Sequence, residues 1–292
     1  MARRPQGSFS ALVEVDDQAF DGIGMFDAFG LDFRADIVPR VDEWVQGAII
    51  HPGFGHPGDL GSPEPPAGEP TVMLLANQNT FRCGVVLGVS VADEQAMLSS
   101  ASIFFEGGRQ HQLALRRILV SKDRTMGLLD GDLDDAVAIT LFEPTFASER
   151  QWHGEGSVHE VLVYGICYRL SVGAPPPMQV ADPLDGRSGK TQTLYFDDAA
   201  MLIPREHPPW LYTIIGPVLQ VDDYEMTVLD QHVLKVRVVV ARLDDDKDVD
   251  VDLFVTKTAL RGGKRPKVGD MIEASVALCA RLWEPNVAFS AE

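Results

Sequence analysis

The chain has 292 residues, of which 45% are hydrophobic and 23% are charged, a composition typical of a folded globular protein. Its 43 acidic and 25 basic residues give a net charge of −18. Such a charge repels phosphate backbones and anionic membrane surfaces, so we expect neither broad nucleic-acid binding nor membrane attachment. No apolar run approaches the length of a membrane span, and Arg3-Arg4 are not followed by the apolar segment of a twin-arginine signal. We therefore expect a cytoplasmic protein.

The first half of the chain predicts a β-rich domain, a barrel or a sandwich, with one short helix. Strands are expected where apolar residues are clustered or alternate with polar ones, at residues 9–15, 44–50, 71–76, 81–91, 137–142 and 160–170. Asp93 suits the N-cap of a short helix that ends near Ala101. Residues 102–105 and 113–120 suggest a hairpin around Glu106-Gly107-Gly108. Residues 51–70 are almost all polar or turn-forming and predict a long loop.

The best candidate for a domain boundary begins at Gly173, where the sequence GAPPP breaks the strand pattern. We expect an N-terminal domain over residues 1–173, a linker over 174–208 and a C-terminal domain over 209–286. The C-terminal domain is predicted to fold alone. No internal sequence repeat links the two halves, although both are rich in expected strands.

The C-terminal half predicts a five-stranded barrel of the OB type. Five apolar-rich runs lie between Trp210 and Trp283, and most alternate apolar and polar residues. In one of them Val249 to Val255 present valine and leucine on one face and Asp248 to Asp252 present aspartate on the other. Gly216-Pro217 interrupts the first run, as expected for a long strand that bends to join both halves of a barrel.

Three cysteines, Cys83, Cys167 and Cys279, are widely spaced along the chain. An odd number at such spacing does not suit a disulfide framework or a metal site. We expect reduced thiols within strands.

Two segments of the first half resemble a known family. The run from Ile139 to Phe146 (ITLFEPTF) resembles an I-T-F-F-D-P-x-[FY] segment, and Val161 to Leu170 resembles the L-x-A-L-A-Y-x-L strand that follows it. Both motifs are typical of a family of uncharacterised bacterial intracellular proteins with a domain of unknown function. The C-terminal part of that family also resembles the run from Gly216 to Asp270. This chain departs from the family at Glu143, where aspartate is usual, and at Gly165, where alanine is usual. The resemblance implies a fold and a cytoplasmic location, and it transfers no catalytic residues.

Two segments come close to known catalytic motifs without completing them. Gly186 to Thr191 (GRSGKT) ends like a phosphate-binding loop, but Leu184 occupies the position of the required first glycine. Gly88 to Ala92 (GVSVA) differs from a nucleophile elbow at its last position, and its valines favour an ordinary strand. We therefore expect a basic turn and a strand, respectively.

The histidines and aspartates also lack a complete metal motif. His51, His56, His153 and His159 do not show the spacing that places two imidazoles on one helical face, so surface positions are expected. Two aspartate clusters occupy residues 130–135 and 244–252, and neither ends in the glutamate of a calcium loop. We expect solvated hairpin tips and an acidic strand face that discourages edge pairing, with weak cation binding as the alternative.

One basic cluster stands out on this acidic chain. It consists of Arg261, Lys264, Arg265 and Lys267, in the loop before the last barrel strand. It is the candidate ligand loop, although single-strand binding usually needs aromatic stacking platforms as well.

No catalytic residue, metal ligand or cofactor is predicted from the sequence. The leading hypothesis is a non-enzymatic cytoplasmic protein that acts through contacts with a protein partner. Oligonucleotide or nucleotide binding on the C-terminal barrel is the first alternative. A hydrolase that uses residues 51–70 as a lid is the second.

Overall fold

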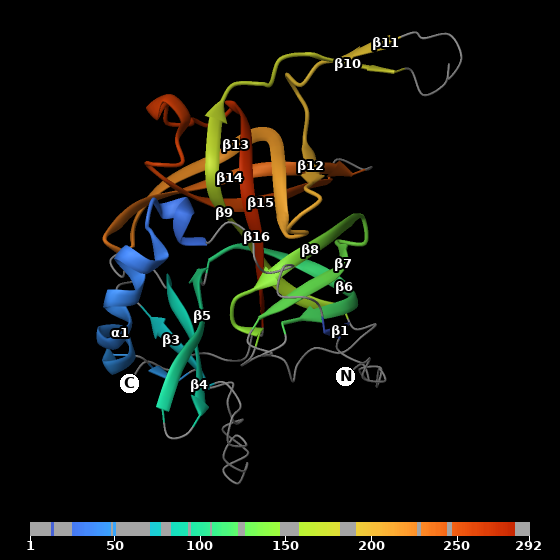
Figure 1. Ribbon diagram of the computed structural model, residues 1–292. Helices are drawn as coiled ribbons and strands as arrows, with labels where there is room; N and C mark the ends of the chain where they lie inside the picture. The colour runs from blue at the N-terminus through green and yellow to red at the C-terminus, as the bar shows by residue number, and fades with distance from the viewer. Residues whose placement is uncertain are drawn as a thin grey trace.

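The computed structural model describes residues 13–14, 25–47, 49–50, 71–76, 83–92, 95–105, 107–121, 126–146, 158–181, 191–226, 229–243 and 247–283. Within them the protein is mainly β with one short α-helix, as the sequence predicts. Ten strands belong to one large sheet, and a four-stranded sheet lies beside it (Figure 1). Among the helices described, none combines the length and the apolar character needed to cross a lipid bilayer.

The predicted C-terminal barrel is confirmed as a barrel-like ring of five strands, but only four of them lie within residues 209–286. The ring contains β13 (Leu211–Met226), β14 (Gln231–Leu243), β15 (Lys247–Thr256), β16 (Met271–Leu282) and β9 (Val158–Val172). Strand β13 pairs with β14 and β16, and β15 runs parallel to β9, which in turn pairs with β16. An OB-fold has the same scheme: its first strand lies between the second and the fourth, and its third strand runs parallel to the fifth. Strands β13, β14, β15 and β16 correspond to the first four. The fifth strand here is β9, which comes from the N-terminal half.

The long strand β13 bends as its sequence predicts. Residues 211–217 pair with β16, and residues 218–226 pair with β14 after a register shift between Val218 and Gln220. At the bend, a Cβ on Gly216 would collide with the backbone carbonyl of Val239. The first apolar run of the sequence and Glu225-Met226 of the second therefore lie in one strand, and its bend lets the sheet close on itself.

A second ring repeats this topology in the N-terminal half. Its strands are β6 (Arg109–Val120), β7 (Gly127–Leu133), β8 (Val137–Glu143), β9 and β16. Strand β6 pairs with β7 and β9, and β8 runs parallel to β16 through one residue pair, Phe142 with Cys279. The fourth strand of each ring is thus the fifth strand of the other.

One hydrophobic core runs through both rings. It contains inward-facing residues of β6–β9 and of β13–β16, among them Leu141, Val163, Ile214, Val251 and Leu278. The alternation predicted for Val249 to Val255 is confirmed, since all four apolar residues lie in this core. Burial of these side chains is the main contribution to the stability of the rings.

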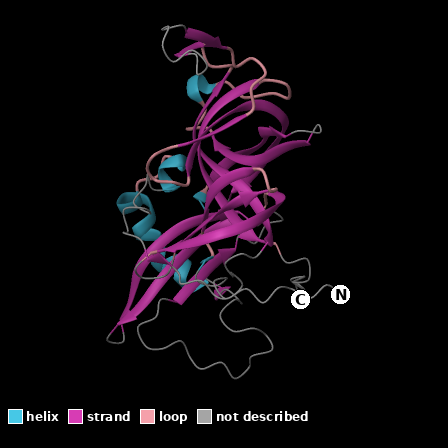
Figure 2. Cartoon of the chain, turned by 90° about the vertical axis from the view of Figure 1, so that its right-hand side faces the viewer, coloured by secondary structure: helices cyan, strands magenta, loops and turns pink. Residues whose placement is uncertain are grey.

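The four-stranded sheet covers the outside of the shared β9–β16 pair. It is made of β2 (Ile49–Ile50), β3 (Thr71–Ala76), β4 (Cys83–Ala92) and β5 (Gln95–Phe105). Phe105 stacks on Phe254 with ring centroids 3.7 Å apart, and Tyr164 meets both rings edge-on. Helical segments η2 (Met25–Phe29), η3 (Phe33–Ile37), η4 (Val38–Arg40) and α1 (Val41–Gly47) lie along one side of the strands (Figure 2). These elements form a second core.

Several expectations for the first half are wrong. Residues 95–101 of the expected helix lie in strand β5, which pairs with β4, and residues 93–94 lie outside the described part of the chain. The expected strand over residues 44–50 is mostly α1, which turns Trp44 into the second core. The expected hairpin of residues 102–105 with 113–120 does not form, because β5 and β6 belong to different sheets. Strand β7 was not expected at all. Residues 51–70 lie outside the described part of the chain.

The segment predicted as a linker contains three short strands. Strands β10 (Met178–Ala181) and β11 (Thr191–Leu194) form a two-stranded ribbon that projects from the body, and β12 (Met201–Pro204) pairs with β13 at the edge of the large sheet (Figure 1). The short β1 (Val13–Glu14) pairs with β6. The domain boundaries stay a prediction. Because β9 and β16 each complete the ring of the other half, we no longer expect the C-terminal half to fold alone.

We predict that residues 209–283 expressed alone do not fold into a stable barrel. The fragment lacks β9, so β15 and β16 each lose a ladder partner. Its amide proton signals should be poorly dispersed in NMR spectra and should disperse when residues 107–173 are added in trans. Residues 107–146, which lack β9, are the matched control and should not rescue folding. Well-dispersed signals from residues 209–283 alone would contradict the exchange of strands.

Candidate functional site

The predicted ligand loop connects β15 to β16. Arg261, Lys264, Arg265 and Lys267 are all exposed there, around the short helix η7 (Arg261–Gly263). Arg265 forms a 2.7 Å ion pair with Asp223 of β13. In the OB scheme this loop connects strands 3 and 4. OB ligands usually lie on strands 2 and 3, and on the loops that connect strand 1 to strand 2 and strand 4 to strand 5. A ligand at this loop stays a prediction.

The outer face of β14 and β15, the usual OB ligand face, is occupied by paired charges. The Asp252 carboxylate lies 2.9 Å from Nε of Arg237 and 3.8 Å from Nζ of Lys235, with only 2% of its side chain exposed. The Asp250 carboxylate lies 3.0 Å from Nε of Arg109, which comes from β6 of the other ring. The hydrogen bond from Arg237 to Asp252 raises the pKa of the arginine. This network joins the two rings.

His111 adds a second link between the same strands. Its Nδ1 lies 2.6 Å from the carboxylate of Asp134 and its Nε2 lies 2.8 Å from the backbone carbonyl of Asp250. Both partners offer acceptor oxygens, so a ring nitrogen that carries a proton donates a hydrogen bond to its partner. Burial on its own raises the pKa of Asp134, but the hydrogen bonds from His111 and from the backbone of Gln112 outweigh it and lower this pKa. The His111 ring thus ties β6 to β15.

The expectation of solvated aspartates is wrong for three of them. Asp130, Asp250 and Asp252 are buried and ion-paired, and β15 is not an edge strand because it pairs with β14 and with β9. Asp134 and Asp135 do lie in the turn between β7 and β8. Residues 244–246 lie outside the described part of the chain. Burial of the three carboxylates is tolerated because arginine or lysine compensates each of them.

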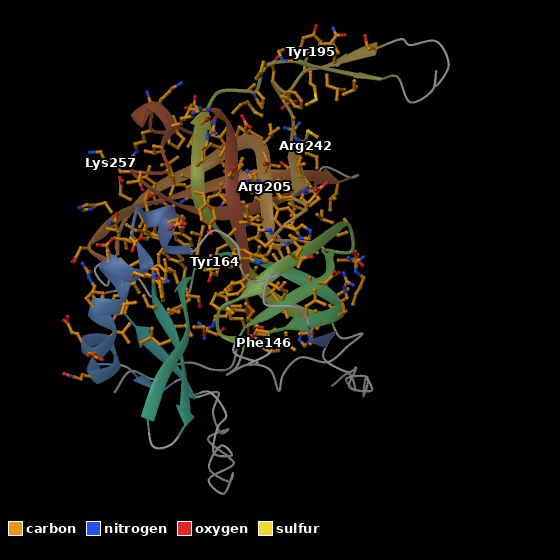
Figure 3. The ribbon with its side chains drawn as sticks, viewed as in Figure 1. Phe146, Tyr164, Tyr195, Arg205, Arg242 and Lys257 are labelled. Atoms are coloured by element: carbon orange, nitrogen blue, oxygen red, sulfur yellow. The ribbon has the colours of Figure 1, made fainter. Side chains whose placement is uncertain are left out.

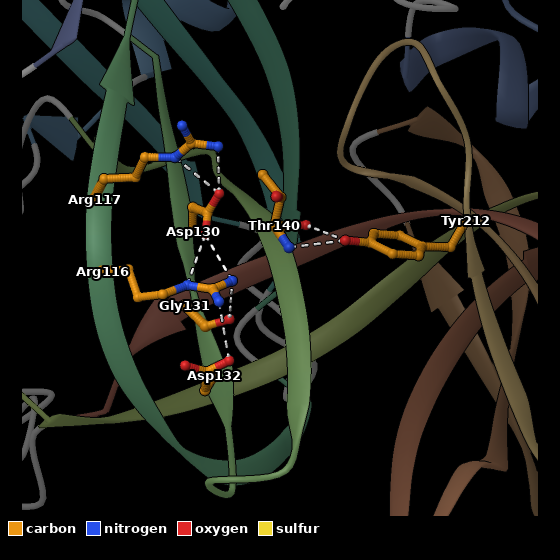
Figure 4. A network of polar contacts seen from close by, with 7 residues as sticks. All are labelled: Arg116, Arg117, Asp130, Gly131, Asp132, Thr140 and Tyr212. Atoms are coloured by element: carbon orange, nitrogen blue, oxygen red, sulfur yellow. Dashed lines mark hydrogen bonds and ion pairs between the residues drawn. The ribbon is translucent and has the colours of Figure 1, made fainter.

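A comparable network lies on the N-terminal ring (Figure 4). The Asp130 carboxylate lies between Arg116 and Arg117, at 3.0 and 2.8 Å, and Arg116 also reaches Asp132 at 3.3 Å. Arg116 further donates to the backbone carbonyl of Gly131. The N-terminal ring thus carries its compensated charges between its first and second strands, β6 and β7, whereas the C-terminal ring carries them on β14 and β15.

Tyr212 closes the weakest seam of the N-terminal ring. Strands β8 and β16 share one residue pair, and the Tyr212 hydroxyl takes the place of a further ladder partner (Figure 4). It accepts a hydrogen bond from the Thr140 backbone N–H at 2.8 Å and donates one to the Thr140 carbonyl at 3.2 Å. Burial raises the pKa of Tyr212, which keeps the hydroxyl proton available for donation.

The thiols lie in strands, as expected. Cys83, Cys167 and Cys279 are buried and not joined in disulfides. Burial raises the pKa of Cys167 to about 12 and raises that of Cys279 further. Thiols held in the protonated form are poor nucleophiles, so they suit packing better than catalysis.

The remaining motifs add no chemistry to the site. Gly88 to Ala92 lie within β4, which confirms the strand expected there. Residues 186–190 of the phosphate-loop look-alike, and His51, His56 and His153, lie outside the described part of the chain. His159 lies in β9. Across the described residues, no group of three or more His, Cys, Asp or Glu side chains is placed to hold a metal ion.

Exposed apolar side chains mark a different region, which the sequence analysis missed. Along the segment from β10 to β12, exposed fractions reach 53% for Met178, 69% for Tyr195, 37% for Met201 and 38% for Ile203. Figure 3 places Tyr195 on the projecting ribbon, away from the packed body. The proline-rich start of this segment suggested a plain linker, and nothing in its local pattern shows that its strands stand away from the cores.

Comparisons of this chain with protein-family models, with curated proteins and with solved structures found no match. The resemblance to the bacterial intracellular family stays a prediction. The candidate sites are therefore judged on their own geometry. The charge networks are engaged with neighbouring strands, whereas Met178, Tyr195, Met201 and Ile203 are exposed.

We predict that Tyr212→Phe destabilises the protein by about 1–3 kcal/mol, because it leaves the N–H and C=O of Thr140 without their partner in a partly buried seam. Urea unfolding measures the loss. Tyr195→Phe is the matched control, since that ring is exposed, and should change the stability little. An equal effect of both substitutions would show that the Thr140 contact does not hold the seam.

We predict that Asp134→Asn weakens the protein at neutral pH and loses its effect in acid. The pKa of Asp134 is lowered in the folded state, so its contribution is fully present above the ordinary value of 3.8 and is lost as pH falls through the lowered value. Urea midpoints of the two proteins should converge below about pH 4. Asp135→Asn, at the exposed neighbour in the same turn, is the control. A constant gap between wild type and Asp134→Asn at every pH would contradict the His111 link.

Proposed function

We propose that this chain is a non-enzymatic protein that acts by binding a protein partner. The observation that carries the proposal is the exposure of large apolar side chains between β10 and β12. Exposed apolar side chains that gather in one region of a protein surface usually mark an interaction site. We call residues 174–196 the arm, which contains β10 and β11.

The two faces of the arm differ in chemistry. Directly opposed residues of an antiparallel pair lie on one face, so Met178, Val180 and Leu194 share a face that is largely apolar. The other face is polar, and there Gln179 accepts a 2.8 Å hydrogen bond from the hydroxyl of Thr191. Met178, Val180 and Leu194 belong to neither hydrophobic core. An isolated two-stranded ribbon is marginally stable in water, so packing of its apolar face against a partner would stabilise it.

The base of the arm is fixed to the body. Phe196 is buried, with 5% of its surface exposed. Two residues later, Asp198 pairs with Arg242 of β14 through two contacts of 2.7 and 3.0 Å, and these hydrogen bonds lower the pKa of Asp198. A fixed base holds the arm in position, so binding requires less ordering of the chain.

The edge strand β12 carries two further exposed apolar side chains, Met201 and Ile203. Met201 and Ile203 alternate with Leu202, which packs against the ring core, so the first two point outward. The edge itself is short and ends in Pro204, which has no N–H for a further ladder. The surface therefore suits side-chain packing better than addition of another strand.

A photo-reactive residue tests the proposal. Benzoylphenylalanine at position 178, on the apolar face, should give a covalent adduct with a protein when cells that produce the full chain are irradiated. The same residue at position 179, on the polar face, is the matched control and should give much less. Adducts are separated by mass and identified by mass spectrometry. Equal labelling at both positions, or none at position 178, would sink the proposal.

A further inference from the structure

We infer that the loop between β15 and β16 binds an acidic segment of a partner protein. We call residues 257–268 the basic loop. It carries five positive charges and no negative charge, on a chain whose net charge is −18. The inference concerns a surface other than the arm, so it goes beyond the proposed function. The five cations of the basic loop are all exposed: Lys257, Arg261, Lys264, Arg265 and Lys267.

Most of these cations have no partner within the described part of the chain. Four of the five form no ion pair with any described residue, and the fifth, Arg265, pairs with Asp223 at 2.7 Å. On the strands of the same ring, by contrast, Arg237 and Arg242 each pair with an aspartate. The basic loop therefore offers uncompensated positive charge, which is complementary to carboxylates from outside the chain.

The end of the basic loop is fixed to the bend of β13. The Gly269 N–H donates a 2.8 Å hydrogen bond to the Val218 carbonyl, and the Val218 N–H donates a 2.9 Å hydrogen bond to the Asp270 carbonyl. The Asp270 carboxylate accepts a 3.0 Å hydrogen bond from the backbone N–H of Lys267, and Pro266 between the cations is buried. A surface held in this way needs less ordering when it binds.

Two further features favour a protein segment over a nucleic acid as the partner. Val268 and Leu219 flank the hydrogen bond between Gly269 and Val218, and they are 68% and 44% exposed, so they offer apolar contact to a partner's side chains. Residues 257–268 contain no aromatic ring on which a base could stack. The acidic remainder of the chain also repels a long polyanion, whereas a short segment touches the basic loop alone. The partner segment thus presents carboxylates together with an apolar side chain.

Fluorescence anisotropy of a labelled peptide mixed with the purified full chain tests the inference. The probe is an octapeptide of six glutamates and two leucines, and the control peptide has glutamine in place of every glutamate. We expect only the acidic probe to bind. Its dissociation constant should rise at least about tenfold between about 50 and about 200 mM NaCl, because salt screens exposed ion pairs.

Charge reversal on the chain shows whether the basic loop is the binding surface. Arg261→Glu combined with Lys264→Glu should raise the dissociation constant at least about tenfold at low salt. Arg34→Glu combined with Arg205→Glu is the matched control, because it changes the net charge equally at two exposed positions outside the loop. It should leave the dissociation constant within a few-fold. Equal weakening by both pairs, tighter binding of a decathymidylate than of the acidic peptide, or no binding of the peptide would overturn the inference.

A photo-reactive residue separates this inference from the proposed function. Benzoylphenylalanine at position 268 should crosslink, in cells that produce the full chain, to a segment rich in aspartate and glutamate, which mass spectrometry of the adduct identifies. Arg261→Glu with Lys264→Glu should abolish this adduct. If position 268 labels no acidic segment while position 178 labels a protein, the inference fails and the proposed function stands. Labelling at position 268 but not at position 178 would have the opposite meaning.

Discussion

The antiparallel pairing of β9 with β16 is the interaction on which the rest of the structure depends. Each of these strands completes the ring of its own half as the fourth strand and closes the other ring as the fifth. Two parts of β9 pair with different rings: residues 158–163 pair with β6, and residues 164–167 pair with β15. Neither ring has a complete set of backbone partners without the other half. Strands β6, β8, β13 and β15 pair directly with one of these two strands.

The second core forms where the N-terminal elements cover the β9–β16 pair. The outer face of the pair carries Tyr164, Ile166 and Cys279, which would be exposed on an isolated pair of rings. The four-stranded sheet and the helical segments bury them, with Phe105 stacked on Phe254 at the centre. The N-terminal elements therefore act as a cap on the junction. The side of the molecule that carries the arm receives no such cover from the described residues.

Local patterns predicted what depends on neighbours in the sequence. The alternation in β15 and the glycine bend in β13 were predicted because a period of two and a missing side chain are local properties. The strand at residues 160–170 was predicted, but its place as the fifth strand of the C-terminal ring was missed, because that pairing depends on contacts more than 80 residues apart, such as Tyr164 with Asp252. Strand β7 was missed because Asp130 and Asp132 suggested a solvated turn, and only Arg116 and Arg117 of the neighbouring strand make a buried aspartate acceptable.

The buried ion pairs also join residues far apart in the sequence, so local patterns did not predict them. Two rings of equal topology offer many wrong pairings of similar apolar strands, and a slip of one residue exchanges the inner and outer faces of a strand. Compensated buried ion pairs add little net stability, whereas one buried charge without its partner costs several kcal/mol. Arg109 meets Asp250 and Arg237 meets Asp252 only in the native register. A slipped strand would leave these carboxylates buried and alone. The charge network thus selects one register among many, and apolar burial then stabilises it.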